Sequence, residues 1–213
     1  MRIVITGREE QQRELAAKPL PEGVTIYWAN DHDAGITDAD AYFDLLYEDN
    51  GAFFRDTGNK PVFVNAVLDT SAALEKNMIR INAWPGFLQR DIMEIAGTEA
   101  ALAEGKKILD ALQWKHQEAP DAPGLIAARI ICMIINEAYF GWGEGLSSRQ
   151  DIDTAMKLGT NYPYGPFEWS EKIGLARIHA LLLRLQQADA RYDMAPALVQ
   201  ELNKTYTADK PVP

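Results

Sequence analysis

The sequence has 213 residues, of which 47% are hydrophobic and 24% charged, so it is long enough for one or two globular domains with a buried core. Its net charge of −10 argues against a nucleic-acid-binding protein, which presents a basic surface to phosphates. The apolar runs are far shorter than the roughly 20 residues that cross a membrane. The N-terminus shows no signal-peptide pattern and Cys132 is the single cysteine, so a reduced, cytoplasmic setting is expected.

Short apolar segments alternate with polar ones through the first half of the sequence. Residues 2–6 are β-branched and predict a strand, and Arg8–Lys18 has the composition of a polar helix. Further strands are predicted at 24–30, 41–46, 61–67 and 78–82. Strands that alternate with helical or polar links indicate a parallel α/β sheet. An amphipathic helix capped by Thr98 is predicted at 98–114, and the prolines of 115–124 predict a boundary.

The second half predicts only helices. Residues 124–145 form an apolar segment that ends in glycines, and it is hydrophobic on more than one side. Such a helix is expected to be buried, in a helical core or in a subunit interface. Shorter helices are predicted at 147–159, on both sides of Gly174 and at 194–204, with a frayed tail at 205–213. The sequence therefore predicts an α/β domain at 1–118 and an all-α domain at 119–213.

Four segments of the second half follow one another in a recognisable order. They are Asp121–Arg129, Asn136–Ala138, Asp151–Gly159 and Pro163–Glu168. Together they resemble the C-terminal domain of the L-3-hydroxyacyl-CoA dehydrogenase family. The resemblance implies a helical domain of the 6-phosphogluconate dehydrogenase C-terminal type. In the family this domain forms the homodimer interface and one wall of an acyl-CoA cleft.

The first half resembles the dinucleotide-binding domain of the same family more loosely. The stretch "RIVITG" is similar to the first strand of that domain, residues 38–49 to its fourth strand, and 81–95 to the turn and strand that carry a glutamate. Between Asp31 and Asp38 the family has a long helical excursion, and here only six residues are present. The resemblance therefore implies a truncated Rossmann-like domain.

The catalytic positions of the family map onto altered residues. The family uses a His as base and a Glu twelve residues later to orient it, and the resemblance places these positions at Asn82 and Glu94. The family's Ser falls near Asn65 and its Asn on Ala128. An amide does not titrate and cannot be the base, although Asn82 could still hydrogen-bond Glu94 or a substrate carbonyl. His116 and His179 occupy no matched position and are expected to be surface or packing residues.

The cofactor fingerprint is also altered. The Gly-x-Gly-x-x-Gly pattern lets the backbone approach a pyrophosphate at a helix N-terminus, and here the stretch reads "GREEQQ", with only Gly7 retained. Two acids, Glu9 and Glu10, would lie beside the diphosphate, and Gln11 and Gln12 add bulk. Asp31 follows Gly7 at a spacing that suits a ribose-binding acid. NAD is thus a possible cofactor, but the stretch argues against its usual binding mode.

Three functions are compatible with this sequence. The first is a non-catalytic member of the family, a binding or regulatory homodimer. The second is an active NAD(P)-dependent oxidoreductase of fatty acid metabolism, acting on 3-hydroxyacyl-CoA or a related hydroxy acid. The third is a small-ligand binding protein whose interdomain cleft is lined by aromatic residues, with core packing as their other role: Trp84, Tyr162, Tyr164 and Trp169. The joint loss of the glycines, the His and the Asn favours the first. No metal site is predicted, because no Cys/His cluster is present.

Overall fold

The computed structural model describes residues 1–208 and divides the chain into two compact units, with the division between Ile126 and Ala127. We call these the N-terminal and C-terminal domains. The division lies after Ile126 rather than after residue 118, because the intervening segment is bound to the sheet. Its Gly124 N–H donates to the Val67 carbonyl at 2.7 Å.

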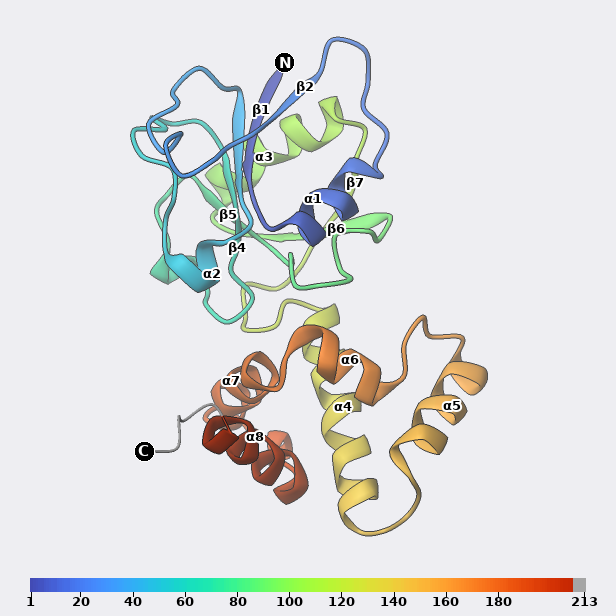
Figure 1. Ribbon diagram of the computed structural model, residues 1–213. Helices are drawn as coiled ribbons and strands as arrows, with labels where there is room; N and C mark the ends of the chain where they lie inside the picture. The colour runs from blue at the N-terminus through green and yellow to red at the C-terminus, as the bar shows by residue number, and fades with distance from the viewer. Residues whose placement is uncertain (209–213) are drawn as a thin grey trace. The chain divides into compact units, whose positions relative to one another are not determined.

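The N-terminal domain is built on one seven-stranded sheet in the order β2-β1-β3-β4-β5-β6-β7 (Figure 1). The strands are β1 (Arg2–Thr6), β2 (Thr25–Trp28), β3 (Ala41–Asp44), β4 (Val62–Asn65), β5 (Met78–Ile81), β6 (Ile92–Ala96) and β7 (Lys115–Glu118). The five strands predicted from apolar runs are confirmed. All neighbours are parallel except β5 and β6.

Strand β7 lies where the sequence predicted a boundary, so that prediction was wrong for residues 115–118. The strand reads Lys-His-Gln-Glu and has no apolar alternation. It pairs with β6 alone, at the edge of the sheet. An edge strand with polar side chains carries no hydrophobic pattern, because neither face needs to be fully buried.

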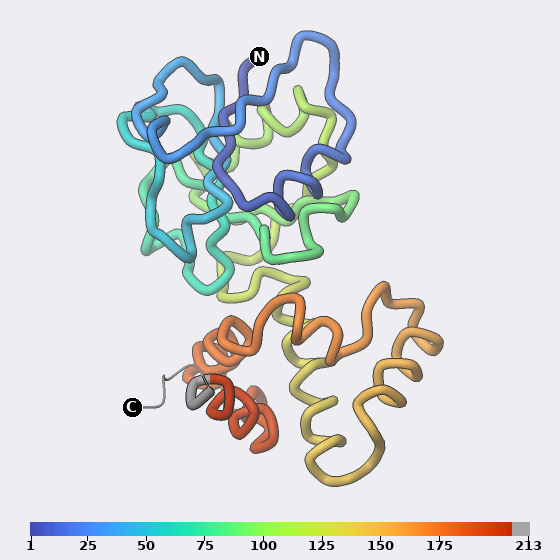
Figure 2. The backbone as a smooth tube through the Cα atoms, viewed as in Figure 1, coloured from blue at the N-terminus to red at the C-terminus, as the bar shows by residue number. Residues whose placement is uncertain are grey.

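The chain crosses over β1 between β2 and β3, which lie on opposite sides of β1 (Figure 2). This reversal of direction makes the carboxyl ends of β1 and β3 the topological switch point of the sheet. In open α/β sheets, ligands bind in the crevice at that point. The residues that directly follow β1 and β3 are therefore the first candidates for a ligand site.

The two faces of the sheet are covered differently. Alternate strand residues such as Ile3 and Ile5 pack with helices α1 (Glu9–Ala16) and α3 (Glu99–Ala111). The opposite face carries Val4 and packs on residues of the connecting segments, among them Ile36 and Phe54. Short helices α2 (Tyr47–Asn50) and η1 (Ser71–Ala73) follow β3 and β4. Helices thus cover one face, and mainly loops cover the other.

The C-terminal domain is all helical, as predicted. Its helices are α4 (Ala127–Gly143), α5 (Arg149–Thr160), α6 (Pro166–Ile173), α7 (Leu175–Gln186), η2 (Ala190–Tyr192) and α8 (Pro196–Ala208). Helix α4 packs against α6, α7 and α8 and forms the centre of the domain. Residues 205–208 of the expected frayed tail belong to α8, and 209–213 lie outside the described residues.

Two of the recognised segments of this domain, Asp151–Gly159 and Pro163–Glu168, are joined by hydrogen bonds. Asp153 on α5 is buried, and its carboxylate accepts hydrogen bonds from the Phe167 N–H at 2.8 Å and the Glu168 N–H at 3.3 Å. It therefore satisfies the free N–H groups at the start of α6. A Cβ on Gly165 would lie 2.3 Å from the Asp153 carboxylate, so this position accepts only glycine without rearrangement.

Arg80 is a fully buried cation in the middle of β5. Its Nε donates to the Ala66 carbonyl at 2.9 Å, and its Nη1 pairs with Asp121 at 2.7 Å. Its Nη2 reaches the Val67 and Ala122 carbonyls at 3.3 and 3.1 Å. The guanidinium thus joins the loop after β4 to the segment after β7. A buried charge is tolerated only with such partners.

Removal of the Asp121 carboxylate is expected to destabilise the N-terminal domain strongly. The change Asp121→Ala leaves a buried guanidinium without its anion, which costs about 3–5 kcal/mol. Urea unfolding followed by circular dichroism measures the loss. The matched control is Asp38→Ala, because Asp38 pairs with Arg2 at 2.8 Å on an exposed surface and should leave the unfolding midpoint unchanged. Equal effects of the two changes would contradict a role for the buried pair.

Candidate functional site

The sequence-predicted site residues lie at the carboxyl ends of neighbouring parallel strands. Gly7 follows β1, Asn65 ends β4 and Asn82 follows β5. Glu94 lies in the adjacent antiparallel strand β6. The sheet therefore brings together residues that are far apart in the sequence.

Asn82 and Glu94 are both 6% exposed and line one small cavity of about 10 Å³, which has room for about one water molecule. The hydrogen bond expected between them is not formed, because the Asn82 Nδ2 has no hydrogen-bond partner and the carboxylate can only accept. Asn82 Oδ1 instead accepts from the Trp84 N–H at 3.2 Å. The cavity thus contains an unused amide donor.

The Glu94 carboxylate has partners that the sequence did not indicate. One oxygen accepts from Arg90 Nη1 at 3.1 Å, and the other accepts from the Ile126 N–H at 3.1 Å. Arg90 is half-exposed and lines the same cavity. A positive side chain therefore faces Glu94, which is held to the segment that leads out of the domain.

Asn65 contributes to the backbone geometry at this site. It is buried, and its Oδ1 accepts from the Ala83 N–H at 2.9 Å, which ties the end of β4 to the turn after β5. Ala128 is a buried residue in the first turn of α4. Neither side chain offers an acid or a base.

No histidine lines the Asn82 cavity. His116 lies on β7, and its Nε2 contacts Asp110 Oδ1 at 2.9 Å. His179 lies on α7 in the other domain. Cys132 is buried in α4, and burial raises the pKa of its thiol, as suits a core residue. The cavity therefore offers the acid Glu94 and no base of the imidazole type.

The fingerprint turn after β1 is filled by protein side chains. Gln11 is 5% exposed, and its amide bonds to backbone groups of three segments. Gln12, at the third glycine position, donates to the Gly7 carbonyl at 2.9 Å. A Cβ on Gly7 would lie 2.9 Å from Leu45 Cδ1. The residues present do not fit NAD in its usual mode, because the space beside the helix N-terminus is already occupied.

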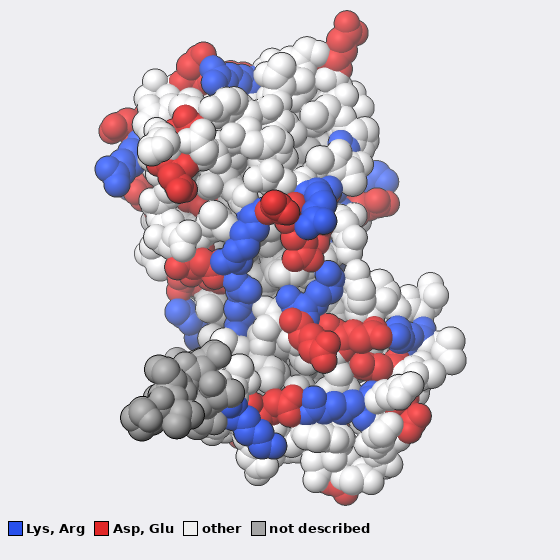
Figure 3. Space-filling view, viewed as in Figure 1, with Lys and Arg blue, Asp and Glu red and all other residues white. Residues whose placement is uncertain are grey.

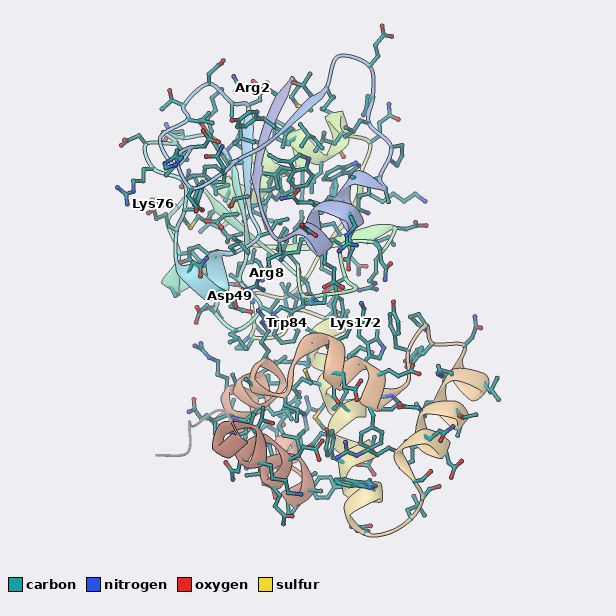
Figure 4. The ribbon with its side chains drawn as sticks, viewed as in Figure 1. Arg2, Arg8, Asp49, Lys76, Trp84 and Lys172 are labelled. Carbon is teal, nitrogen blue, oxygen red and sulfur yellow. The ribbon has the colours of Figure 1, made fainter. Side chains whose placement is uncertain are left out.

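Asp31 lies in the turn that follows β2, and it is exposed. Since β1 and β2 are parallel neighbours, this turn and Gly7 follow the same edge of the sheet. The position suits a ribose-binding acid. Arg8 Nη2 pairs with Asp49 Oδ2 at 2.9 Å, between the residues after β1 and α2 (Figure 4).

Three of the aromatic residues proposed for a ligand cleft, Trp84, Tyr164 and Trp169, have contacts within their own domain. Trp84 is buried, and its Nε1 donates to Glu48 Oε2 at 2.6 Å (Figure 4). The other Glu48 oxygen accepts from the Val67 and Leu68 N–H groups, both at 2.8 Å. In the C-terminal domain, Tyr164 packs edge-on against Trp169, with ring centroids 4.9 Å apart.

Asp44 ends β3 at the switch point and is almost fully buried. Its carboxylate accepts from the Phe53 N–H at 2.7 Å and the Leu46 N–H at 3.2 Å. Desolvation by burial raises the pKa of Asp44 to about 6, against the opposing effect of these two bonds. Asp44 was not among the site residues predicted from the sequence. Its position between Phe43 and Leu45 in a predicted strand is the pattern that could have indicated a buried acid.

The described residues also bear on three other kinds of functional feature: a basic surface, a metal site and a membrane-spanning helix. Acidic and basic side chains are interspersed on the face shown in Figure 3, with no extended basic area on that face. Among residues 1–208, no three His, Cys, Asp or Glu side chains are grouped to hold a metal ion. Within the same residues, no helix combines the length and hydropathy needed to cross a bilayer.

Comparison with known proteins identifies the C-terminal domain. Residues 124–210 match the family model described as 3-hydroxyacyl-CoA dehydrogenase, C-terminal domain. The 3-hydroxyadipyl-CoA dehydrogenase of Escherichia coli K12 is 53% identical over 66 residues, 31% of this chain and 14% of that protein. A 3-hydroxybutyryl-CoA dehydrogenase of Bradyrhizobium diazoefficiens is 34% identical over 111 residues, 51% of this chain and 38% of that protein. The matches thus cover well under half of each relative's own length.

Solved structures support the fold of the whole chain. The (S)-3-hydroxybutyryl-CoA dehydrogenase of Ralstonia eutropha aligns with a TM-score of 0.66 at 18% identity, over 96% of this chain and 94% of that chain. At that identity the likeness shows the fold alone. A Rossmann-like sheet followed by an all-helical domain defines a protein with a dehydrogenase-type fold. The family-model match is confined to the second part of the chain, so residues 124–210 are of the 3-hydroxyacyl-CoA dehydrogenase C-terminal type.

The buried Asp44 predicts a specific pH dependence of stability. Its pKa is about 6 in the native state and near 3.8 when unfolded, so the native state binds more protons between these values. Its contribution to the free energy of unfolding therefore falls as the pH rises from about 4 to about 6. The total is on the order of 2–3 kcal/mol, since one pKa unit is about 1.4 kcal/mol.

The measurement is urea unfolding of the wild type and Asp44→Asn across this pH range. The difference between the two proteins isolates Asp44 from the other carboxylates. It should shift in favour of the variant as the pH rises. A difference that stays constant with pH would show that the native and unfolded pKa values of Asp44 are alike.

Proposed function

We propose that this chain is a non-catalytic member of the 3-hydroxyacyl-CoA dehydrogenase family that acts by binding. The single observation that carries the proposal is the state of the Asn82–Glu94 pair. The position of the family base holds an amide whose Nδ2 makes no bond to Glu94, and Arg90 pairs with the carboxylate instead. An amide cannot take a hydroxyl proton.

The chemical class of the ligand follows from the family. The relatives are named for 3-hydroxybutyryl-CoA and 3-hydroxyadipyl-CoA, so an acyl-CoA is the first ligand to test. The unused Asn82 N–H can donate to a carbonyl oxygen, and Arg90 adds a positive charge at the same cavity. Binding of a thioester without turnover is compatible with these groups.

The second candidate is an active dehydrogenase with rearranged site residues. The retention of Glu94 beside Asn82 in one cavity favours it. Such an enzyme needs a nicotinamide cofactor as hydride acceptor. The filled fingerprint turn argues against the usual binding mode of that cofactor, so we rank this candidate second.

Turnover distinguishes the two candidates. We expect no NADH oxidation above background when micromolar protein is mixed with acetoacetyl-CoA, because loss of an acid–base group removes about 10²–10⁴-fold of the rate. Thermal shift with acetoacetyl-CoA and free CoA measures binding in the same samples. Oxidation that Glu94→Gln abolishes would establish the second candidate. Oxidation that Glu94→Gln leaves unchanged would come from a contaminating enzyme, because Glu94 is the only acid lining the cavity.

We also propose that the chain forms a homodimer through the C-terminal domain. Helix α4 is packed on several sides, yet Ile130 on this helix is 51% exposed. Two further large apolar side chains of the domain, Leu146 and Leu158, are largely exposed. Large apolar side chains exposed on a domain in this way suit contact with a second copy of the chain.

The dimer is tested by light scattering coupled to size exclusion. The wild type is expected to have twice the mass of one chain at micromolar concentration, and Ile130→Glu to have the mass of a monomer, because a charge in an apolar interface is desolvated without a partner. Leu20→Glu, on an exposed residue of the N-terminal domain, is the matched control and should leave the mass unchanged. A monomeric wild type would refute the dimer.

A further inference from the structure

We infer that the Gln11 side chain takes the place of the dinucleotide phosphates, so that the switch-point crevice is closed by the chain itself and accepts no nicotinamide dinucleotide. The inference rests on the proposed function and deepens it, since it identifies the residue that excludes the cofactor. It concerns binding, and is therefore separable from turnover.

The amide of Gln11 is fully used by backbone groups around the crevice. Its Nε2 donates to the carbonyls of Leu45 and Ala83, both at 3.0 Å. Its Oε1 accepts from the Arg8 N–H at 2.9 Å. These partners follow β3, β5 and β1, respectively. One buried side chain thus joins three strand ends that a bound ligand would otherwise separate.

The Arg8 N–H is one of the backbone donors at the start of α1, where a phosphate would bind. Arg8 is the N-terminal cap residue of α1, and free N–H groups at a helix N-terminus are what bind phosphate oxygens. Here Gln11 Oε1 satisfies this donor from within the helix. The two carbonyls that accept from Gln11 Nε2 point at the same amide, and a phosphate in that place would face their negative ends.

The turn has no spare volume on its inner side. A Cβ added to Gly7 would lie 2.9 Å from Leu45 Cδ1 and 3.4 Å from Gln11 Oε1. Close packing against Leu45 and Gln11 therefore explains why residue 7 is a glycine. A bound pyrophosphate is not needed to explain it.

The outer side of the crevice carries the wrong charge for a diphosphate. Glu9 and Glu10 occupy the first turn of α1, and the Glu9 side chain is 91% exposed. Acidic side chains at a helix N-terminus interact favourably with the helix dipole. Here they supply the negative charge that a ligand would bring. The Arg8–Asp49 pair uses the nearby cation. Both the hydrogen-bonding and the charge of a bound phosphate are thus replaced by side chains.

The test compares Gln11→Ala with Gln12→Ala in the full-length protein. Gln12 is an amide on the same helix with one hydrogen bond, to the Gly7 carbonyl. Loss of the three Gln11 bonds leaves buried backbone groups unpaired and should lower the melting temperature by about 5–10 °C. Gln12→Ala should lower it by less than about 3 °C. Equal shifts in the two variants would overturn the inference.

Titration of the wild type and of Gln11→Ala with NAD+, NADH and NADPH, followed by calorimetry and by quenching of Trp fluorescence, measures binding directly. We expect no saturable signal from the wild type up to millimolar ligand. Saturable NADH binding without turnover would overturn the closed crevice and leave the proposed function standing. Turnover of acetoacetyl-CoA that depends on Glu94 would refute the proposed function itself. Binding of NADH gained only in Gln11→Ala would support the inference.

Discussion

The N-terminal domain depends on the need to satisfy one buried positive charge. Arg80 lies inside a strand, where its charge cannot reach water, and four oxygens of the loops after β4 and β7 surround it. Partial burial disfavours the charged form of Asp121, but hydrogen bonds from Ser71 and from Arg80 outweigh this and lower the pKa of that carboxyl. The position of the segment that leads into the helical domain is therefore set by an electrostatic requirement of the sheet.

Other buried polar side chains likewise join the segments at the carboxyl edge of the sheet. Gln11 joins the ends of β1, β3 and β5, Glu48 joins the loop after β4 to Trp84, and Arg80 joins that loop to the segment after β7. In a doubly wound fold this edge is where ligands bind, since backbone groups there are otherwise unpaired. In this chain the groups bind one another. The small cavity of Asn82 lies on the β5–β6 side of the sheet, away from the switch point.

The sequence predicted the fold well and the site only in outline. The pattern of apolar and helix-forming residues located β1 to β5 and the helices of eight or more residues, because each depends on residues close together in the chain, but it did not predict α2, η1 or η2. It missed β7, whose single neighbour is 23 residues earlier in register, Ile92 with Lys115. The motif spacing singled out Asn82 and Glu94, which line one cavity, and no hydrogen bond joins the Asn82 Nδ2 to Glu94. Gln11 was interpreted as bulk, because its partners Leu45 and Ala83 are 34 and 72 positions away and no local pattern reveals them.

The Asp153–Gly165 contact ties two segments of the matched region, residues 124–210, to the packing of the helical domain. The Asp153 carboxylate accepts hydrogen bonds from the N–H groups at the start of α6. Gly165 leaves room for that carboxylate because it has no side chain. A change at either position would disturb the contact that the other makes. Asn136 is in the same situation, with both ends of its amide bound to the backbone at Asp193 and Ala195. A sequence match in this domain therefore reports how its helices pack, and it carries no information on the chemistry of the Asn82 cavity, whose residues all belong to the N-terminal domain.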